Sequence, residues 1–314
     1  MLEKKRECPF DLEAELKKTA ILVLGIMLAA ALSLGPACST AKQAGPHPKG
    51  HLLIIGGGER TAAIMKRFLD LAAGFGQGKI VVFTMATGVP EEVRQETLAE
   101  YKGLGVEDVA IYHLTRDEAV KPDAAKILHG AGGVFFTGGD QSCLTAVLLD
   151  TPILARLHEM YEQGCVIGGT SAGAAVMSEV MITGDEKRTK NEDELWQTIE
   201  ADNVVRVRGF GLVKNVIVDQ HFLVRRRQNR LVSLVLENPA LLGAGIDEST
   251  AILVRPDGKW EVLGESQVVV VDARAAKVSR APSKVLGAHG ATLNILLPGD
   301  VFDPVTGRAE EPSK

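Results

Sequence analysis

A seven-residue stretch near the middle of the chain has the residue types and spacing of a catalytic serine site. The run Gly168-Gly-Thr-Ser-Ala-Gly-Ala174 contains a Gly-x-Ser-x-Gly pattern centred on Ser171. Apolar residues on both sides predict a buried strand that turns sharply into a helix. A serine on such a turn stands clear of the backbone, and the amide of Ala172 can face an oxyanion. A glycine-rich turn without catalytic function gives the same pattern, so the partners of Ser171 decide between the two.

Two histidines downstream of Ser171 are candidates for the general base. His221 follows an apolar segment at the end of a predicted strand, where parallel α/β sheets place their active sites. His289 lies in Gly287-Ala-His-Gly-Ala291, which predicts a turn between late β-strands. The position of His221 at a strand end, among many polar residues, favours it as the base.

The carboxylate that would orient the base has two adjacent candidates. Asp247 and Glu248 follow the apolar segment Ala244-Gly-Ile246. In an extended chain, neighbouring side chains point to opposite faces, so only one of the two can face the site. The residues themselves do not choose between them.

Four arginines follow His221 closely: Arg225, Arg226, Arg227 and Arg230. We predict that they lie on one helix over residues 224–236. They could form an ordinary solvated helix surface. Next to an active site, guanidinium groups suit a substrate that carries carboxylates, and a local basic cluster in a net acidic chain favours this interpretation.

The composition excludes several classes of protein. The 314 residues, 46% of them hydrophobic, can bury a full core, and a formal net charge of −5 gives no reason to expect nucleic acid as a partner. The four cysteines lack metal-binding spacing and no His-Glu-x-x-His motif occurs, so we predict neither a metal nor a cofactor. The turn at Gly56 lacks the Gly-x-Gly-x-x-Gly pattern, and Glu59 would repel phosphate, which disfavours a nucleotide site.

Residues 1–37 predict an export signal. Lys17 and Lys18 precede an apolar run over residues 20–34, and small residues lead up to Cys38. The layout is also similar to a lipoprotein signal in which Cys38 carries lipid, although Leu34 lies one place too far upstream. An uncleaved anchor is the alternative, because the run is close to the shortest spanning length. We therefore expect a periplasmic or extracellular protein, with or without a membrane tether at Cys38.

The elements that must position these residues alternate between strands and helices from His51 onward. Continuous apolar strands of this kind predict a parallel sheet covered by helices on both faces. Residues 183–202 are polar and charged, which predicts a surface loop or flap, and the chain from residue 241 predicts β-structure with a hairpin turn at Pro256-Asp-Gly258. Strands are expected over 52–55, 80–84, 109–113, 134–137, 165–167 and 213–218, and helices over 61–73, 91–102, 123–128, 144–149, 153–163 and 224–236. The domain boundaries predicted are 38–50 for a flexible tether, 51–299 for the folded domain and 300–314 for a C-terminal tail.

These residues together resemble the cyanophycinase family, serine hydrolases related to the aspartyl dipeptidases called peptidase E. The resemblance extends over about residues 51–299. It rests on blocks in the right order: Ile55-Gly-Gly-Gly-Glu59, Phe136-Thr-Gly-Gly-Asp-Gln141, Gly168–Ala174, Asp219–Leu231 and Gly245–Ala251. The fold it implies is a three-layer α/β sandwich around a mostly parallel sheet, similar to class I glutamine amidotransferases, with a β-rich C-terminal part.

The resemblance also implies roles for individual residues. Ser171 would be the nucleophile, His221 the general base and Glu248 the orienting acid. The order Ser-acid-His, known from α/β-hydrolases, keeps Ser171–Asp247–His289 as an alternative triad. Oxyanion donors would come from the Gly139–Asp140 loop and from Ala172. Substrate binding would fall to Gln141, Asp219, Gln220, Arg225, Arg227 and Arg230.

Three functions are compatible with these residues. The first is an exported exopeptidase that releases β-Asp-Arg dipeptides from cyanophycin, a polyaspartate with arginine on each side-chain carboxyl. The second is an aspartyl or isoaspartyl dipeptidase on the same scaffold. The third is a catalytically inactive, lipid-tethered binding protein, which an intact triad argues against. The resemblance further implies a homodimer and a polypeptide substrate.

Overall fold

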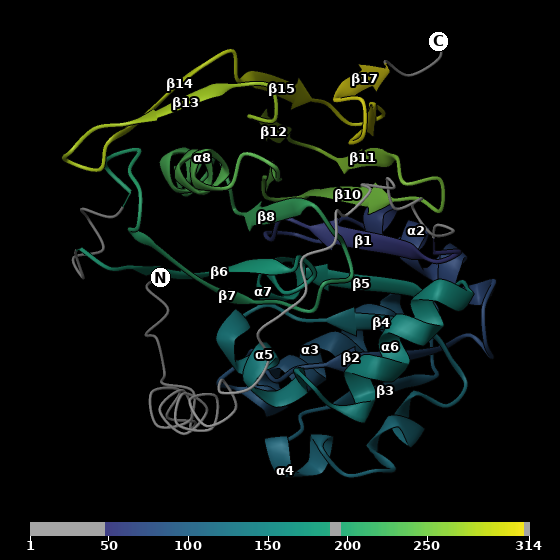
Figure 1. The fold of residues 1–314 in the computed structure, drawn as a ribbon. Helices are drawn as coiled ribbons and strands as arrows, with labels where there is room; N and C mark the ends of the chain where they lie inside the picture. The colour runs from purple at the N-terminus through teal and green to yellow at the C-terminus, as the bar shows by residue number, and fades with distance from the viewer. Residues whose placement is uncertain (1–47, 189–195, 311–314) are drawn as a thin grey trace, which may run out of the picture.

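The alternating strands and helices fold around one large sheet, as a computed structural model describes for residues 48–188 and 196–310 (Figure 1). The sheet has nine strands in the order β17-β16-β11-β10-β1-β5-β4-β2-β3. Neighbours from β1 to β3 pair in parallel, and the strands from β10 to β17 add to β1 in antiparallel pairs. Its strands are β1 (His51–Ile55), β2 (Lys79–Phe83), β3 (Val109–Tyr112), β4 (Ala131–Phe136), β5 (Val166–Thr170), β10 (Thr250–Val254), β11 (Trp260–Gly264), β16 (Val301–Asp303) and β17 (Arg308–Glu310).

Helices cover both faces of the parallel part of this sheet. On one face, Ile64 and Phe68 of α2 pack with Leu53 of β1, and on the other, Leu144 of α5 packs with Ile167 of β5. Burial on both faces explains why these strands are continuously apolar. The predicted three-layer α/β architecture is therefore confirmed. The helices are α2 (Ala62–Ala73), α3 (Pro90–Gly103), α4 (Arg116–Ala119), η1 (Ala124–Leu128), α5 (Gln141–Leu148), α6 (Pro152–Gln163) and α7 (Ala172–Ala175).

A second sheet of four strands, in the order β15-β12-β9-β8, packs with helix α8. Only β8 and β9 are parallel, which brings the ends of both strands to one edge. Two smaller pairs, β6–β7 and β13–β14, lie beside α8 (Figure 1). The elements are β6 (Val180–Glu186), β7 (Val204–Arg208), β8 (Val216–Gln220), α8 (Gln228–Glu237), β9 (Leu242–Ile246), β12 (Val268–Asp272), β13 (Lys277–Arg280), β14 (Leu286–His289) and β15 (Thr292–Leu296).

Three expectations about local structure need correction. Residues 301–310, predicted as part of a tail, form β16 and β17, because Phe302 is buried against Trp260 with ring centroids 5.4 Å apart. The helix predicted from residue 224 begins only at Gln228, since Arg226 has a positive φ of 54° that no helix accommodates. The predicted loop 183–202 begins instead as strand, because residues up to Glu186 belong to β6.

Several predicted segments lie outside the described residues. They include the export signal, most of the tether and residues 189–195 of the charged segment. Among the residues that are described, no helix is both long enough and apolar enough to cross a bilayer.

Candidate active site

The turn after β5 places Ser171 at the carboxyl edge of the central sheet. Ser171 has φ 53° and ψ −110°, a strained conformation for a residue with a side chain, and its amide donates to Ile55 O at 3.0 Å. The flanking glycines are required sterically. A Cβ on Gly173 would lie 2.2 Å from Phe136 O, and one on Gly169 would lie 2.4 Å from Gly173 O. The predicted sharp turn between strand and helix is therefore what these residues form.

The structure brings the side chains of Ser171, His221 and Glu248 together. His221 Nε2 lies 2.9 Å from Ser171 Oγ, and His221 Nδ1 lies 2.5 Å from Glu248 Oε1. Since the carboxylate only accepts, Nδ1 carries the proton and Nε2 is free to accept the Ser171 hydroxyl hydrogen. A serine, a base and an orienting acid in this order have the geometry of an activated nucleophile.

The surroundings of His221 favour its neutral form. Burial lowers the pKa of His221; its hydrogen bond with Glu248 opposes this, and the positive charges of Arg225 and Arg227 lower the pKa further. The net direction is downward from the ordinary value of a histidine. At neutral pH the imidazole is therefore unprotonated, which is the form that a general base needs.

The alternative triad of Ser171, Asp247 and His289 is not assembled. Both Asp247 oxygens are occupied, because Oδ1 accepts from the amides of Leu223 and Val224 and Oδ2 accepts from Ser266 Oγ at 2.8 Å. His289 is the exposed last residue of β14, opposite Lys277 in the β13–β14 pair. Asp247 thus anchors the turn after His221, and the sequence motif could not reveal this role.

The glycine-rich turn after β1 connects the two sides of the site. Gly56 O accepts from the amide of His221 at 2.7 Å, and Gly57 O accepts from the amide of Ser249 at 2.8 Å. A Cβ on Gly57 would lie 2.2 Å from the His221 ring, and one on Gly58 would lie 2.7 Å from Glu248 Cβ. The sequence marked this turn as a block of the resembled family and disfavoured a nucleotide site there. Its positioning role was missed, although glycines at a strand end were the available signal.

Only some of the predicted oxyanion donors are available to a substrate. Ala172 is the first residue of α7, so its amide has no acceptor within that helix. A Cβ on Gly138 would lie 3.3 Å from Ser171 Cβ, which places the 138–139 loop against the nucleophile. The amide of Asp140, however, donates to Ala86 O at 2.8 Å, and its side chain caps α5 through Ser142 N. Ala172 and Gly139 remain candidates, whereas the Asp140 amide is already engaged.

Three of the residues predicted to bind substrate are instead occupied by other protein groups. Asp219 and Arg230 form a bidentate ion pair, with side chains 0% and 2% exposed. Gln141 Nε2 donates to the carbonyls of Ile182 and Thr183 and so holds β6. These three side chains support the site from within, because their polar atoms already have buried partners.

The other predicted binding residues lie beside His221; Gln220 among them is buried, whereas Arg225 and Arg227 reach closer to solvent. Arg227 donates to both the backbone oxygen and Oε1 of Gln220, at 2.7 and 2.8 Å, and its side chain is 14% exposed. Arg225 is exposed, and its amide donates to His221 O. We call Gln220, Arg225 and Arg227 the rim. The rim presents positive charge next to the triad geometry, as the sequence predicted, but from a turn rather than from a helix.

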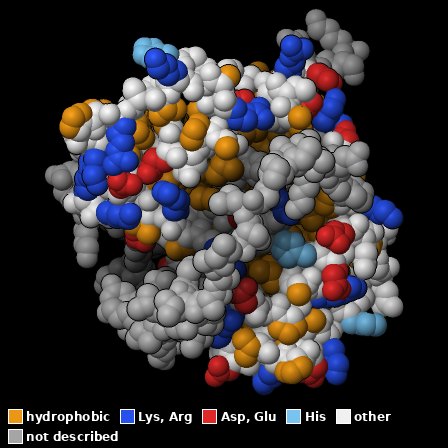
Figure 2. Space-filling view, viewed as in Figure 1, with side chains coloured by type: hydrophobic (Ala, Val, Ile, Leu, Met, Phe, Trp, Pro, Cys, Tyr) orange, Lys and Arg blue, Asp and Glu red, His pale blue; other side chains and the backbone are white. Residues whose placement is uncertain are grey.

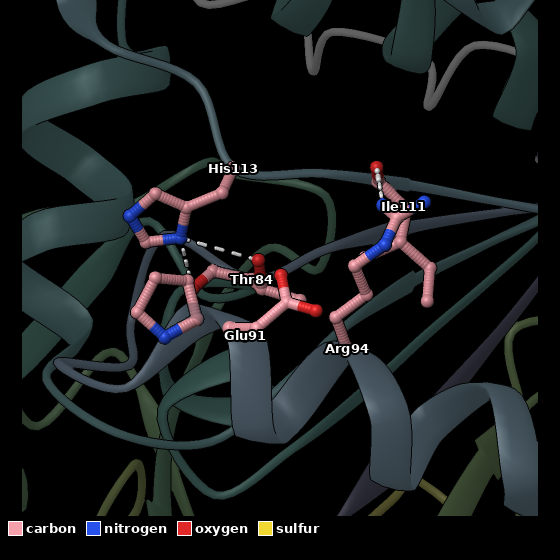
Figure 3. Close-up of a pocket in the computed structure, with 6 residues that line it drawn as sticks. Thr84, Glu91, Arg94, Ile111 and His113 are labelled. Atoms are coloured by element: carbon pink, nitrogen blue, oxygen red, sulfur yellow. Dashed lines mark hydrogen bonds between the residues drawn. The ribbon is translucent and has the colours of Figure 1, made fainter.

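A separate depression lies at the carboxyl ends of β2 and β3 (Figure 3). His113 contacts Thr84 there, and Arg94 donates to Ile111 O at 3.2 Å. None of the predicted site residues lines it.

Basic and acidic side chains are interspersed over the face shown in Figure 2. No group of three possible metal ligands occurs within residues 48–188 and 196–310.

Comparison with known proteins identifies relatives over most of the chain. Residues 52–262 match the model of "Peptidase family S51". A cyanophycinase from Synechococcus elongatus is 33% identical over 281 residues, covering 87% of this chain and 84% of that protein. A cyanophycinase from Nostoc sp. (strain PCC 7120 / SAG 25.82 / UTEX 2576) is 34% identical over 260 residues, covering 80% of this chain and 84% of that protein.

A solved structure has a similar fold. The crystal structure of a peptidase from an acI-B1 Actinobacterium superposes with a TM-score of 0.62 at 23% identity, over 82% of this chain and 98% of that one. The resemblance to the cyanophycinase and peptidase E-like family is therefore confirmed by the curated relatives, and the fold by the solved structure.

Proposed function

The chain belongs to peptidase family S51, and we propose that this serine peptidase hydrolyses cyanophycin to β-Asp-Arg dipeptides. The observation that carries the proposal is the hydrogen-bonded series Ser171–His221–Glu248 beside the rim arginines. Two relatives named cyanophycinase, each about one third identical, support the choice of substrate.

In the proposed reaction, Ser171 Oγ attacks the aspartyl carbonyl carbon. His221 Nε2 takes the hydroxyl proton as the C–O bond forms, and Glu248 stabilises the resulting imidazolium through Nδ1. The amides of Ala172 and Gly139 donate to the oxyanion. His221 then gives its proton to the leaving amine, which departs and leaves an acyl group on Ser171. Water activated by His221 hydrolyses that ester and restores the serine.

The rim would recognise the charged groups of the substrate. Arg225 and Arg227 offer guanidinium donors, which bind carboxylates through paired hydrogen bonds. The α-carboxylate of a β-Asp-Arg unit is such a group, and Gln220 Oε1 orients Arg227 toward it by accepting from its guanidinium. A substrate that carries a carboxylate therefore fits this cationic rim.

The experiment that tests this function compares substrates. We expect the purified protein to release β-Asp-Arg from cyanophycin with a higher kcat/KM than it shows on Asp-X dipeptides. Cleavage of Asp-X dipeptides without release from cyanophycin would contradict the proposal and support the dipeptidase alternative. No covalent labelling by a serine-directed fluorophosphonate would support the inactive binding protein.

We also propose that the protein is exported, with lipid on Cys38, and that it forms a homodimer. The n-region, apolar run and small residues before Cys38 support export. Cell fractionation with the Cys38→Ala variant tests the lipid. The parent protein should follow the membrane fraction and the variant should be released from it; identical fractionation would contradict lipidation. A monomeric mass in light scattering would contradict the homodimer.

A further inference from the structure

Trp196 lies against the buried ion pair behind the rim. The Arg230 guanidinium carbon sits 5.1 Å from the centroid of the Trp196 ring, within the range of a cation–π contact. The Trp196 backbone is fixed from two sides. Its amide donates to Glu186 Oε2 at 3.1 Å, and its carbonyl accepts from Asn229 Nδ2 at 2.8 Å. Strand β6 and helix α8 therefore both hold the Trp196 backbone beside Arg230.

The ion pair depends on this cover. Arg230 Nε donates to Asp219 Oδ2 at 2.7 Å, and Nη2 donates to Oδ1 of the same carboxylate. A buried pair is strong only while water is excluded, because attraction between charges falls as the local dielectric rises. The Trp196 ring occupies one face of the guanidinium and so keeps water from that face.

The ion pair in turn orders the rim. Asp219 Oδ1 also accepts from the amide of Gln220 at 2.8 Å, and Gln220 holds Arg227 through two oxygens. The next residue is His221. A contiguous set of contacts thus leads from Trp196 through Arg230 and Asp219 to the groups that face the substrate.

We propose that Trp196 is a positioning residue for substrate binding, which fixes the rim by covering the Arg230–Asp219 pair. The inference rests on the proposed function, since it assigns a specificity role at the same site. Trp196 comes from the charged segment between β6 and β7. That segment therefore contributes to specificity through a residue that touches no reacting atom.

The test compares Trp196→Leu with Trp196→Phe. Leucine keeps apolar bulk and loses the π-face, whereas phenylalanine keeps the face. We expect Trp196→Leu to raise the KM for cyanophycin about tenfold, with kcat within about twofold of the parent. Trp196→Phe should stay within about twofold in both constants, and the rate of fluorophosphonate labelling at Ser171 should be unchanged in both variants.

Three results would overturn the inference. They are a Leu variant that behaves as the parent, a Phe variant as impaired as the Leu variant, and labelling that falls in parallel with hydrolysis. The last would mean general disruption of the site rather than positioning of the rim.

A second measurement does not depend on the natural substrate. N-acetyl-aspartate, a dicarboxylate probe, should slow fluorophosphonate labelling of the parent, and Trp196→Leu should need about tenfold more of it for equal protection. If the parent cleaves no peptide, the proposed function fails, and this measurement alone decides the role of Trp196. Protection that is absent in the parent, or equal in both proteins, would overturn the inference.

Discussion

The two sheets contribute different kinds of groups to one site. The central sheet supplies Ser171 and the glycine loops, and what it offers to a substrate is mostly backbone. The four-stranded sheet and its following turns supply His221, the rim and the Asp219–Arg230 pair, which act through polar and charged side chains. We infer that the first region supplies the nucleophile and the oxyanion donors, whereas the second supplies the base, the orienting acid and the groups that select the substrate.

Three strained backbone positions lie where the two regions meet. Ser171, His221 and Ser249 have φ angles of 53°, 48° and 52°. Such conformations cost on the order of 1–3 kcal/mol each and persist only where the surroundings hold them. Here the carbonyls of Ile55, Gly56 and Gly57 accept from those three amides. The end of β1 thus fixes the nucleophile and its partners relative to one another.

Removal of the base, which the second region supplies to the nucleophile of the first, should have the largest effect on kcat. His221→Ala leaves Ser171 without a proton acceptor, so we expect kcat to fall by about 10⁶-fold in steady-state assays. His289→Ala is the matched control and should retain parental activity. If His289→Ala were the inactive variant, the alternative triad would be right and the division between the two sheets wrong.

The orienting acid should have the next largest effect. Glu248→Gln keeps the shape of the side chain but removes the charge that fixes the His221 tautomer, so kcat should fall by about 10⁴-fold. Asp247→Asn tests the neighbouring carboxylate, which only anchors a turn, and should lose stability rather than chemistry. Thermal unfolding and kcat measured on both variants distinguish the two roles; a larger loss of kcat in Asp247→Asn would contradict them.

A backbone change at the junction should have an intermediate effect. Gly57→Ala forces a Cβ within 2.2 Å of the His221 ring at a φ of +104°, so the ring must shift and kcat should fall by about 10²-fold. Gly78→Ala is the control, since Gly78 also has a positive φ of 76° but nothing lies within 4 Å of its added Cβ. Equal activity of the two variants would show that the turn does not position His221.

The smallest effect concerns charge on the rim. Protonated His221 cannot accept the serine proton. The rate of fluorophosphonate labelling therefore falls as the pH drops through the pKa of His221. Arg225 lowers that pKa, so Arg225→Gln should raise it and move the acid limb to higher pH. High salt should reduce the difference between variant and parent. Arg226→Gln, an exposed neighbour, is the control; a shift of the limb toward lower pH in Arg225→Gln would contradict the account.

The sequence predicts the parts of the site that local patterns control. The Gly-x-Ser-x-Gly turn needs small residues at fixed positions, and a strand end before His221 brings it to the edge of the sheet. The choice between Asp247 and Glu248 could not be made this way, because it depends on the conformation of the turn at residues 247–249. Local pattern also misplaced the arginines, since the positive φ of Arg226 delays the start of α8.

Long-range partners explain what sequence reasoning missed. Asp219 and Arg230 are eleven positions apart, and only the packing of α8 on β8 and β9 turns them into one buried pair. Gly57 and Trp196 act through His221 and Arg230, residues far from them along the chain. β16 and β17 were missed because the terminal segment that contains Phe302 is short and mostly polar. The aromatic partner of Phe302 is Trp260, which lies on a distant strand.

The most direct test of the account locates the nucleophile. The purified protein is treated with a fluorophosphonate and the adduct is mapped by peptide mass spectrometry. We expect one adduct, on the peptide that contains Ser171, and strongly reduced labelling of His221→Ala. An adduct on another serine, or undiminished labelling of His221→Ala, would contradict the claim that the two sheets meet in a Ser171–His221 pair.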